Sequence, residues 1–261
     1  MSQISIQDVH KVFTSTEREV VALKGIDLEI EKGEFVCLLG PSGCGKSTLL
    51  NAVAGFSLPT TGSIVAEGKT ITEPGPDRGM VFQEYALFPW MTVAQNIAFG
   101  LEIQKKPAEF ITETVAKLLD TLNLKDFANR FPKDLSGGMR QRVAIARVLA
   151  LDSPIMLMDE PFGALDALTR RNLQDELLRI WHASGKTILF VTHSIEESIY
   201  LADRIVVMTY RPGTIKRDQR VDMPRPRDPA APAFNDLKRE LGHLVMEEQQ
   251  RHAADEMKLI D

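Results

Sequence analysis

Residues 40–48 constrain this chain more than any other stretch. They read Gly40-Pro41-Ser42-Gly43-Cys44-Gly45-Lys46-Ser47-Thr48, which fits the pattern of a phosphate-binding loop. Gly43 and Gly45 let the backbone turn its N–H groups toward phosphate oxygens. Lys46 can reach the β- and γ-phosphates, and the hydroxyl of Ser47 can bind Mg²⁺. The whole stretch is therefore a candidate for nucleotide binding.

The sequence on either side of this loop supports that prediction. Residues 35–39 form a short, continuous apolar run, which is typical of a buried parallel strand. Residues 47–54 have the pattern of a helix that Gly55 can end. A strand, a glycine-rich loop and a helix N-terminus form an anion site, so we expect a nucleoside triphosphate site rather than a flexible Gly/Ser turn.

Composition narrows the class of protein. The 261 residues can form one large domain or one domain with a subdomain, and the net charge of −5 argues against general nucleic-acid binding. No apolar run approaches the ~18 residues of a membrane span, and the first residues do not resemble a signal peptide. Cys37 and Cys44 suggest neither a disulfide framework nor a zinc site, so we expect a reducing cytoplasm.

The chain opens with strand patterns that lead into the phosphate loop. Apolar residues alternate over 4–13, 20–23 and 26–30, which predicts an antiparallel β region. Phe13 is the aromatic residue here that we expect to stack on a nucleotide base, the alternative being a plain core phenylalanine. Residues 79–82 predict another strand, ending at Gln83, whose amide can bind a phosphate or a metal-bound water or can belong to a solvated loop.

The middle of the chain is predominantly helical in pattern. Apolar residues repeat at helical spacing between about 89 and 150, which predicts a helical subdomain inserted between two strand-rich regions. The large apolar groups of the run at 85–91 fit either a core or a groove for a partner. At 135–138, Leu-Ser-Gly-Gly is a second candidate anion site, which predicts a dimer in which it closes over the neighbour's nucleotide.

Two more strands end in polar residues suited to catalysis. Residues 155–158 are apolar and are followed by Asp159, which we expect to hold Mg²⁺, and Glu160, which we expect to polarise the attacking water. Residues 187–191 predict a strand after which His193 precedes a helix that begins with a capping box at Ser194 and Glu197. His193 is thus expected at a carboxyl strand end, within reach of the γ-phosphate or of the water.

The last part of the chain predicts a strand at 205–208, a turn at 211–214 and an extended Pro-rich linker at 224–229. Apolar residues from 234 to 245 then predict an amphipathic helix. We favour docking of this helix on its own domain over contact with a partner.

Together these motifs resemble the ATP-binding subunit of an ABC transporter. The resemblance rests on the phosphate loop, Gln83, Leu135-Ser136-Gly137-Gly138, Asp159-Glu160, Leu165-Asp166 and His193. It implies an α/β fold: a P-loop ATPase core with a mainly parallel sheet, an N-terminal antiparallel β region and an inserted helical subdomain. The implied ABC ATPase domain covers residues 1–220, with the helical subdomain at about 89–150, and the linker and C-terminal helix cover 221–261.

The resemblance also implies roles for the site residues. Two subunits, which we expect to be identical, pair head to tail. ATP then lies between Lys46, Ser47, Gln83, Asp159 and His193 of one subunit and Ser136, Gly137 and Gly138 of the other. Mg²⁺ is held by Ser47, Gln83 and Asp159, Glu160 is the general base, Asp166 communicates across the dimer, and Phe13 stacks on adenine. The chain departs from the family at Met139, where Gln is common, which puts in question a side-chain contact from that position.

Further features resemble the nitrate/sulfonate/taurine group of bacterial importers, namely the residues at 74–79, 85–93 and 208–213. This resemblance implies an ATPase that powers import of a small solute through a separate integral membrane permease, with an extracytoplasmic solute-binding protein. It implies a peripheral position on the cytoplasmic face of the membrane, and permease contact at 85–91. The alternative is a soluble, non-transport ABC ATPase in cofactor assembly.

Overall fold

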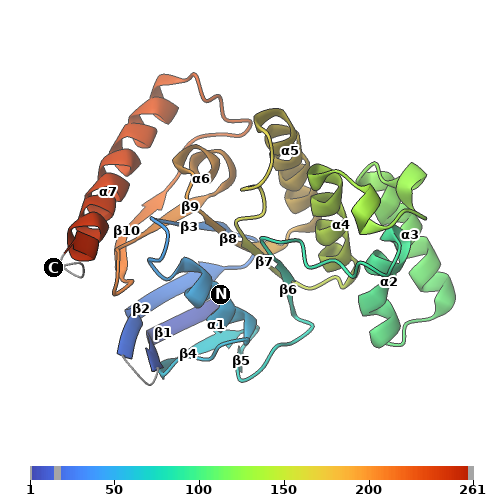
Figure 1. Ribbon diagram of the computed structural model, residues 1–261, viewed down its shortest axis with the longest axis horizontal. Helices are drawn as coiled ribbons and strands as arrows, with labels where there is room; N and C mark the ends of the chain where they lie inside the picture. Colours follow the sequence, from blue (N-terminus) through green and yellow to red (C-terminus); the bar gives the residue numbers. More distant parts are fainter. Residues whose placement is uncertain (1, 15–18, 258–261) are drawn as a thin grey trace. The chain divides into compact units, whose positions relative to one another are not determined.

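The computed structural model describes residues 2–14 and 19–257, which divide into two compact units (Figure 1). The terminal unit contains the described residues up to Gly75 and from Thr187 onward, and the central unit is Pro76–Lys186. The central unit is therefore inserted, along the chain, between the two halves of the terminal unit.

One sheet of the terminal unit is antiparallel and has the strand order β2-β1-β4-β5. Its strands are β1 (Ser2–Thr14), β2 (Glu19–Glu31), β4 (Thr61–Ala66) and β5 (Lys69–Thr70). In β2 the apolar Ile26, Leu28 and Ile30 are buried while Asp27 and Glu29 are exposed. The predicted antiparallel region is confirmed, and the runs at 20–23 and 26–30 belong to one strand.

The other strands of the terminal unit follow the order β10-β9-β3-β8. They are β3 (Phe35–Leu39), β8 (Thr187–Thr192), β9 (Arg204–Met208) and β10 (Ile215–Arg220). The continuous apolar run of β3 is fully buried because the strand pairs in parallel with β8 on one side and β9 on the other. The charged β10, which the hydrophobic pattern did not predict, pairs antiparallel with β9.

Helices α1 (Lys46–Ala54), α6 (Ile195–Leu201) and α7 (Pro232–Met257) complete the terminal unit. Helix α1 ends at Gly55, whose left-handed φ of 83° is the predicted stop. Helix α7, red in Figure 1, packs against α6 and β9 and buries Phe234 and Leu241. The predicted C-terminal helix is thus confirmed and docks on its own unit. Among the described residues, no helix is long and apolar enough to span a membrane.

Arginine side chains fix the segment between β10 and α7, which the prolines had suggested to be an extended linker. The guanidinium of Arg227 is buried and donates hydrogen bonds to the carbonyls of Ile199 and Ala202, each at 2.6 Å. Arg225 pairs with Asp203 at 2.6 Å. Burial lowers the pKa of Arg227 to about 10, so the group stays charged at neutral pH. These bonds satisfy carbonyls at the end of α6 and tie the segment to the unit.

The central unit combines two parallel strands with a group of helices. The strands are β6 (Arg78–Val81) and β7 (Ile155–Asp159). The α-helices are α2 (Val93–Ile103), α3 (Ala108–Thr121), α4 (Gly137–Ala150) and α5 (Ala167–Ser184), with short 3₁₀ turns η1 (Lys125–Phe127) and η2 (Pro132–Asp134). The predicted change to helical structure after β6 is confirmed.

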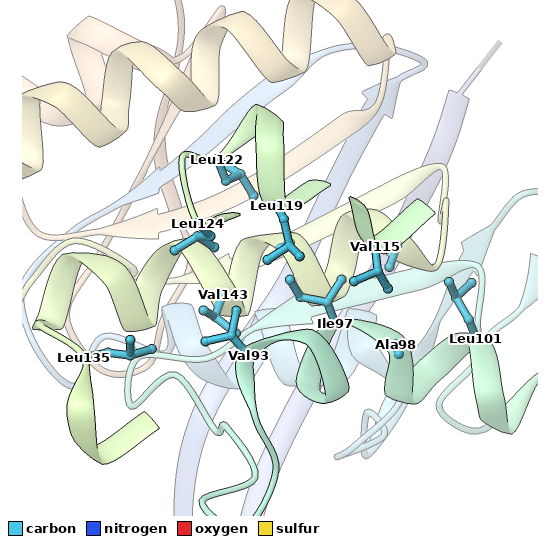
Figure 2. Close-up of a cluster of buried hydrophobic side chains, with 12 residues drawn as sticks. Val93, Ile97, Ala98, Leu101, Val115, Leu119, Leu122, Leu124, Leu135 and Val143 are labelled. Carbon is cyan, nitrogen blue, oxygen red and sulfur yellow. The ribbon is translucent and has the colours of Figure 1, made fainter. Parts of the chain in front are cut away.

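A cluster of buried apolar side chains holds α2, α3 and α4 together (Figure 2). Ile97 of α2, Leu119 of α3 and Val143 of α4 are central to it, and Leu122 and Leu124 extend it beyond α3. Full burial of each such side chain contributes about 1.5–3 kcal/mol. The helical spacing read from the sequence therefore corresponds to a real core.

Candidate functional site

The register of the parallel strands brings the first set of predicted residues to one edge of the sheet. Leu39, the last residue of β3, lies opposite Thr192 of β8 and Val207 of β9. The phosphate loop, which starts at Gly40, and His193 therefore leave the sheet at the same edge. This is the carboxyl edge of the parallel strands, where ligands of such sheets bind.

The phosphate loop leads into the N-terminus of α1, which is a candidate anion site. Gly45 is the N-cap of this helix, with a left-handed φ of 101°, and a glycine has no side chain with which to cap it. A Cβ atom on Gly45 would lie 2.7 Å from Cδ2 of Leu23, so glycine is required both for conformation and for space. The first N–H groups of the helix and its dipole can therefore attract an anion.

Lys46 places a positive charge inside this loop. Its side chain is buried, and its ammonium donates hydrogen bonds to the carbonyls of Gly40 at 2.8 Å and Pro41 at 2.9 Å. Ser47 follows it in the first turn of α1. The loop thus combines backbone N–H groups, an ammonium and a hydroxyl, which is the donor set that triphosphate and Mg²⁺ require.

Phe13 lies on β1, in the antiparallel sheet, rather than at the edge that carries the phosphate loop. Its ring is 46% exposed, and Nζ of Lys11 lies 5.1 Å from the ring centroid. This exposure excludes a plain core phenylalanine. The stacking of Phe13 on adenine stays a prediction.

In the central unit, strand register gathers a second set of predicted residues. Val81 of β6 lies opposite Met158 of β7, so Gln83, Asp159 and Glu160 leave these two strands at the same edge. Glu160 has a left-handed φ of 42°, which is rare for a residue other than glycine. The oxygens of the Gln83 amide and the Asp159 carboxylate are hard donors of the kind that Mg²⁺ prefers.

Backbone hydrogen bonds hold the loop between Glu160 and α5. The N–H of Gly163 donates to the carbonyl of Glu160 at 3.2 Å. The guanidinium of Arg170 donates to the carbonyls of Phe162 at 3.2 Å and Leu165 at 2.8 Å. Arg170 was not identified from the sequence, because its partners are backbone carbonyls.

Asp166 caps the N-terminus of α5. Its carboxylate accepts a hydrogen bond from the N–H of Thr169 at 3.0 Å, and this bond lowers its pKa. The observed role is structural, and its predicted communication across a dimer stays a prediction.

The Leu-Ser-Gly-Gly stretch forms the start of α4. Ser136 is the N-cap and accepts a hydrogen bond from the N–H of Met139 at 3.3 Å. A Cβ atom on Gly138 would lie 2.6 Å from Cγ2 of Thr169, so this glycine allows α4 and α5 to approach closely. The side chain of Met139 packs against the helical core, which explains how an apolar residue fits where the family commonly has Gln.

The run at 85–91 divides between core and surface. Leu87 packs against the helical core, and the ring of Phe88 lies 4.5 Å from that of Phe99, centroid to centroid. Trp90 is 70% exposed. The core interpretation thus holds for Leu87 and Phe88, whereas the partner groove stays a prediction.

Two polar side chains that sequence reasoning missed hold this run in place. The amide of the buried Asn96 donates to the carbonyls of Phe88, Met91 and Thr92 and accepts from the N–H of Phe88. Arg147, whose pKa burial lowers, donates to the carbonyls of residues 85 and 86, both of which have left-handed φ angles. A polar residue at a buried helical position is the signal that could have identified Asn96.

Comparisons with known proteins agree with this geometry. A family model described as ABC transporter matches residues 23–163. A nitrate import ATP-binding protein of Synechocystis sp. is 49% identical over 221 residues, covering 85% of this chain and 83% of that protein. An aliphatic sulfonates import ATP-binding protein of Bacillus cereus is 44% identical over 238 residues, covering 91% of this chain and 94% of that protein.

A solved structure is also similar. It is a dimeric, post-hydrolysis state of an ATP-binding cassette bound to ADP and Pi, with a TM-score of 0.75 and 33% identity, covering 84% of this chain and 99% of that one. The chain belongs to the ABC transporter family. It is an ATP-binding subunit of this family and an ATPase. The predicted fold and the likeness to nitrate and sulfonate importers are confirmed, and the cofactor-assembly alternative is not favoured.

Proposed function

We propose that this ATPase powers the import of a small anion, such as nitrate, a sulfonate or taurine, through a separate membrane permease. The observation that carries the proposal is the match to nitrate and sulfonate import subunits over 85% and 91% of this chain. The permease and an extracytoplasmic solute-binding protein are its expected partners. The chain would then work peripherally at the cytoplasmic face of the membrane, with residues 1–220 as the ATPase domain.

The predicted site residues would each have a separate role in hydrolysis. Residues 40–48 would cradle the phosphates, with Lys46 supplying a direct positive charge. Glu160 would polarise the attacking water, and His193 would form a hydrogen bond with the γ-phosphate or with that water. Phe13 would stack on the adenine ring.

The oxygen donors of Ser47, Gln83 and Asp159 fit Mg²⁺, which would neutralise charge on the phosphates when bound. Ser136, Gly137 and Gly138 would serve the nucleotide of a second, identical subunit in a head-to-tail dimer. The exposed carboxylate of Asp166 would communicate between the two subunits. The dimeric form of the similar ATP-binding cassette supports this arrangement.

The test is a pull-down of tagged Glu160→Gln protein from its native membranes in mild detergent with ATP. The amide removes the base but leaves the phosphate loop unchanged, so ATP should hold the dimer and its partners together. We expect a multi-span membrane protein to copurify, and Lys46→Ala to lose it together with ATP affinity. Recovery of soluble partners alone would overturn the importer assignment, and a monomeric Glu160→Gln protein in ATP would overturn the dimer.

A further inference from the structure

The turn after β9 lies directly against the phosphate loop. Arg211 donates from Nε to the carbonyl of Gly43 at 3.0 Å. A Cβ atom on Gly213 would lie 2.2 Å from the carbonyl oxygen of Cys44, which shows how closely the two backbones approach. The N–H of Gly213 also donates to the carbonyl of Ala22 at 2.9 Å. A shift of this turn would therefore move the phosphate loop.

The bond from Arg211 fixes the orientation of one peptide group in the phosphate loop. In a trans peptide the carbonyl and the following N–H point in opposite directions. Holding the Gly43 carbonyl thus directs the N–H of Cys44, which donates a hydrogen bond to the carbonyl of Pro41 within the loop, N to O at 3.4 Å. This bond helps to set the path of the loop backbone. Backbone N–H groups of such a loop are the groups that bind phosphate oxygens.

The C-terminal helix holds the same turn from the other side. The side chain of Glu248 in α7 is fully buried, and its Oε2 accepts a hydrogen bond from the N–H of Tyr210 at 2.9 Å. Its Oε1 accepts from Nζ of Lys216 in β10 at 2.6 Å. The ring of Tyr210 lies 4.1 Å from that of His252 in α7, centroid to centroid. Figure 1 shows α7 beside β10, the strand that follows the turn.

The contact between Glu248 and the turn depends on the negative charge of its carboxylate. Burial acts to raise the pKa of Glu248, but hydrogen bonds from Lys216 and from the N–H of Tyr210 outweigh it, and the pKa is lowered. The group is therefore a carboxylate at neutral pH, with Arg251 as a further partner at 3.2 Å. A buried carboxylate that loses its charge leaves its donors without compensation, so the turn depends on it.

We propose that Glu248 and Arg211 are positioning residues for nucleotide binding, and that α7 sets the ATP affinity of the phosphate loop through them. Glu248 fixes the backbone of the turn at Tyr210, and Arg211, the next residue, fixes the peptide group at Gly43. The proposal rests on the proposed role of the phosphate loop. It gives the C-terminal helix a function in nucleotide binding.

The chain offers a matched control for this proposal. Glu240, also in α7, pairs with Arg217, also in β10, at 3.2 Å, and both side chains are about half exposed. Glu240→Gln therefore removes an ion pair between the same two elements without altering a bond to the turn. An exposed pair contributes little to stability. Arg211 is itself exposed, so Arg211→Ala tests the proposal in a protein that folds even if Glu248 variants do not.

The experiment measures the dissociation constant of a fluorescent ATP analogue, kcat at saturating ATP, and the melting temperature. Glu248→Gln and Arg211→Ala should each weaken nucleotide binding about fivefold or more, as expected for loss of a hydrogen bond to a charged group. Both should leave kcat within about twofold, and Glu240→Gln should bind normally. The double variant of Glu248→Gln and Arg211→Ala should bind the nucleotide about as weakly as either single variant, because both residues act through the same turn.

Opposite results would overturn the proposal. A lower melting temperature for Glu248→Gln with normal nucleotide binding would make the contact purely structural. Two results would show that the effect does not pass through the turn. One is an equal weakening of nucleotide binding by Glu240→Gln, and the other is a double variant whose loss of affinity is the full product of the two single losses. Lys46→Ala, measured in parallel, separates this from failure of the proposed function: if it binds ATP normally, the phosphate-loop assignment itself is wrong.

Discussion

Glu160, Tyr85 and Ala86 adopt left-handed backbone conformations, with φ of 42°, 60° and 47°. Each such conformation costs of the order of 1–3 kcal/mol in a residue other than glycine, and interactions with the surrounding structure must offset this free energy. The N–H of Gly163 donates to the backbone carbonyl of Glu160, and Arg147 donates to the backbone carbonyls of the other two. Glu160→Gln keeps this backbone bond from Gly163.

Gly213 is a single residue on which the phosphate loop depends sterically. Gly213→Ala would place a methyl group 2.2 Å from the carbonyl oxygen of Cys44, where only a backbone shift can relieve the clash. We expect it to lower the free energy of unfolding by about 2 kcal/mol or more, and to weaken ATP binding. Urea unfolding and nucleotide titration measure both effects.

Gly242→Ala is the control for that substitution. Gly242 lies within α7, and an added Cβ would meet only Cδ1 of Ile195, at an ordinary 4.0 Å. Alanine favours a helix by up to about 1 kcal/mol over glycine, so this variant should be slightly more stable than the natural protein. A Gly213→Ala protein as stable as Gly242→Ala would contradict the steric argument.

At the scale of elements, Asn96 joins helix α2 to the run at 85–91. Its buried amide makes hydrogen bonds to backbone groups of Phe88, Met91 and Thr92. In Asn96→Ala the carbonyls of Phe88 and Thr92 keep bonds from backbone N–H groups, whereas the N–H of Phe88 and the carbonyl of Met91 lose the bond to Asn96. We expect a loss of about 2–4 kcal/mol in the free energy of unfolding, measured by urea denaturation.

Gln95, the neighbouring residue, provides the comparison. Its exposed side chain accepts one hydrogen bond, from the N–H of Thr92 at 2.8 Å, in the capping box of α2. Gln95→Ala should cost only about 0.5–1 kcal/mol. Equal losses for the two variants would mean that Asn96 does not organise the run.

The hydrophobic pattern was sufficient for elements that bury a regular face. The alternation in β2, the continuous run of β3 and the helical spacing of α3 each predicted the structure, because burial imposes those periods. It failed for β10, whose mostly charged residues form a strand because β9 offers an unpaired edge. A strand that forms by pairing with such an edge needs no hydrophobic periodicity in its sequence.

The positions of the candidate site residues in the fold were predictable to the same extent. Within each unit, a residue at the end of a parallel strand, such as His193 after β8 or Glu160 after β7, follows from the rule that neighbouring parallel strands end at the same edge. Arg147, Arg170 and Arg211 were not predictable, since they bind backbone carbonyls of distant residues. In the sequence, such an arginine cannot be distinguished from one that is exposed to solvent.

At the scale of the whole molecule, the exposed Trp90 is the expected point of permease contact. Phe88 is half-buried against Phe99, so a charge there would also disturb the core, whereas Trp90 is 70% exposed. Trp90→Glu should leave ATP hydrolysis by the isolated subunit unchanged and reduce transport about tenfold or more in vesicles, as for a buried interface aromatic.

Ile103→Glu is the matched control, because Ile103 is similarly exposed, at 68%, at the end of α2. It should leave transport close to normal. If Trp90→Glu abolished hydrolysis as well, the residue would support the fold rather than the contact. Equal loss of transport in both variants would indicate that the interface extends well beyond the run.

The burial of both cysteines has a practical chemical consequence. Cys37 lies within β3 and Cys44 within the phosphate loop, and both are free thiols with no exposed surface. Burial raises the pKa of each thiol, and at Cys44 Lys46 only partly opposes the rise. Neither sulfur is both accessible and ionised, as reaction with a maleimide requires. We therefore expect neither native cysteine to react with a maleimide dye. In a Trp90→Cys variant, the dye would label position 90 alone.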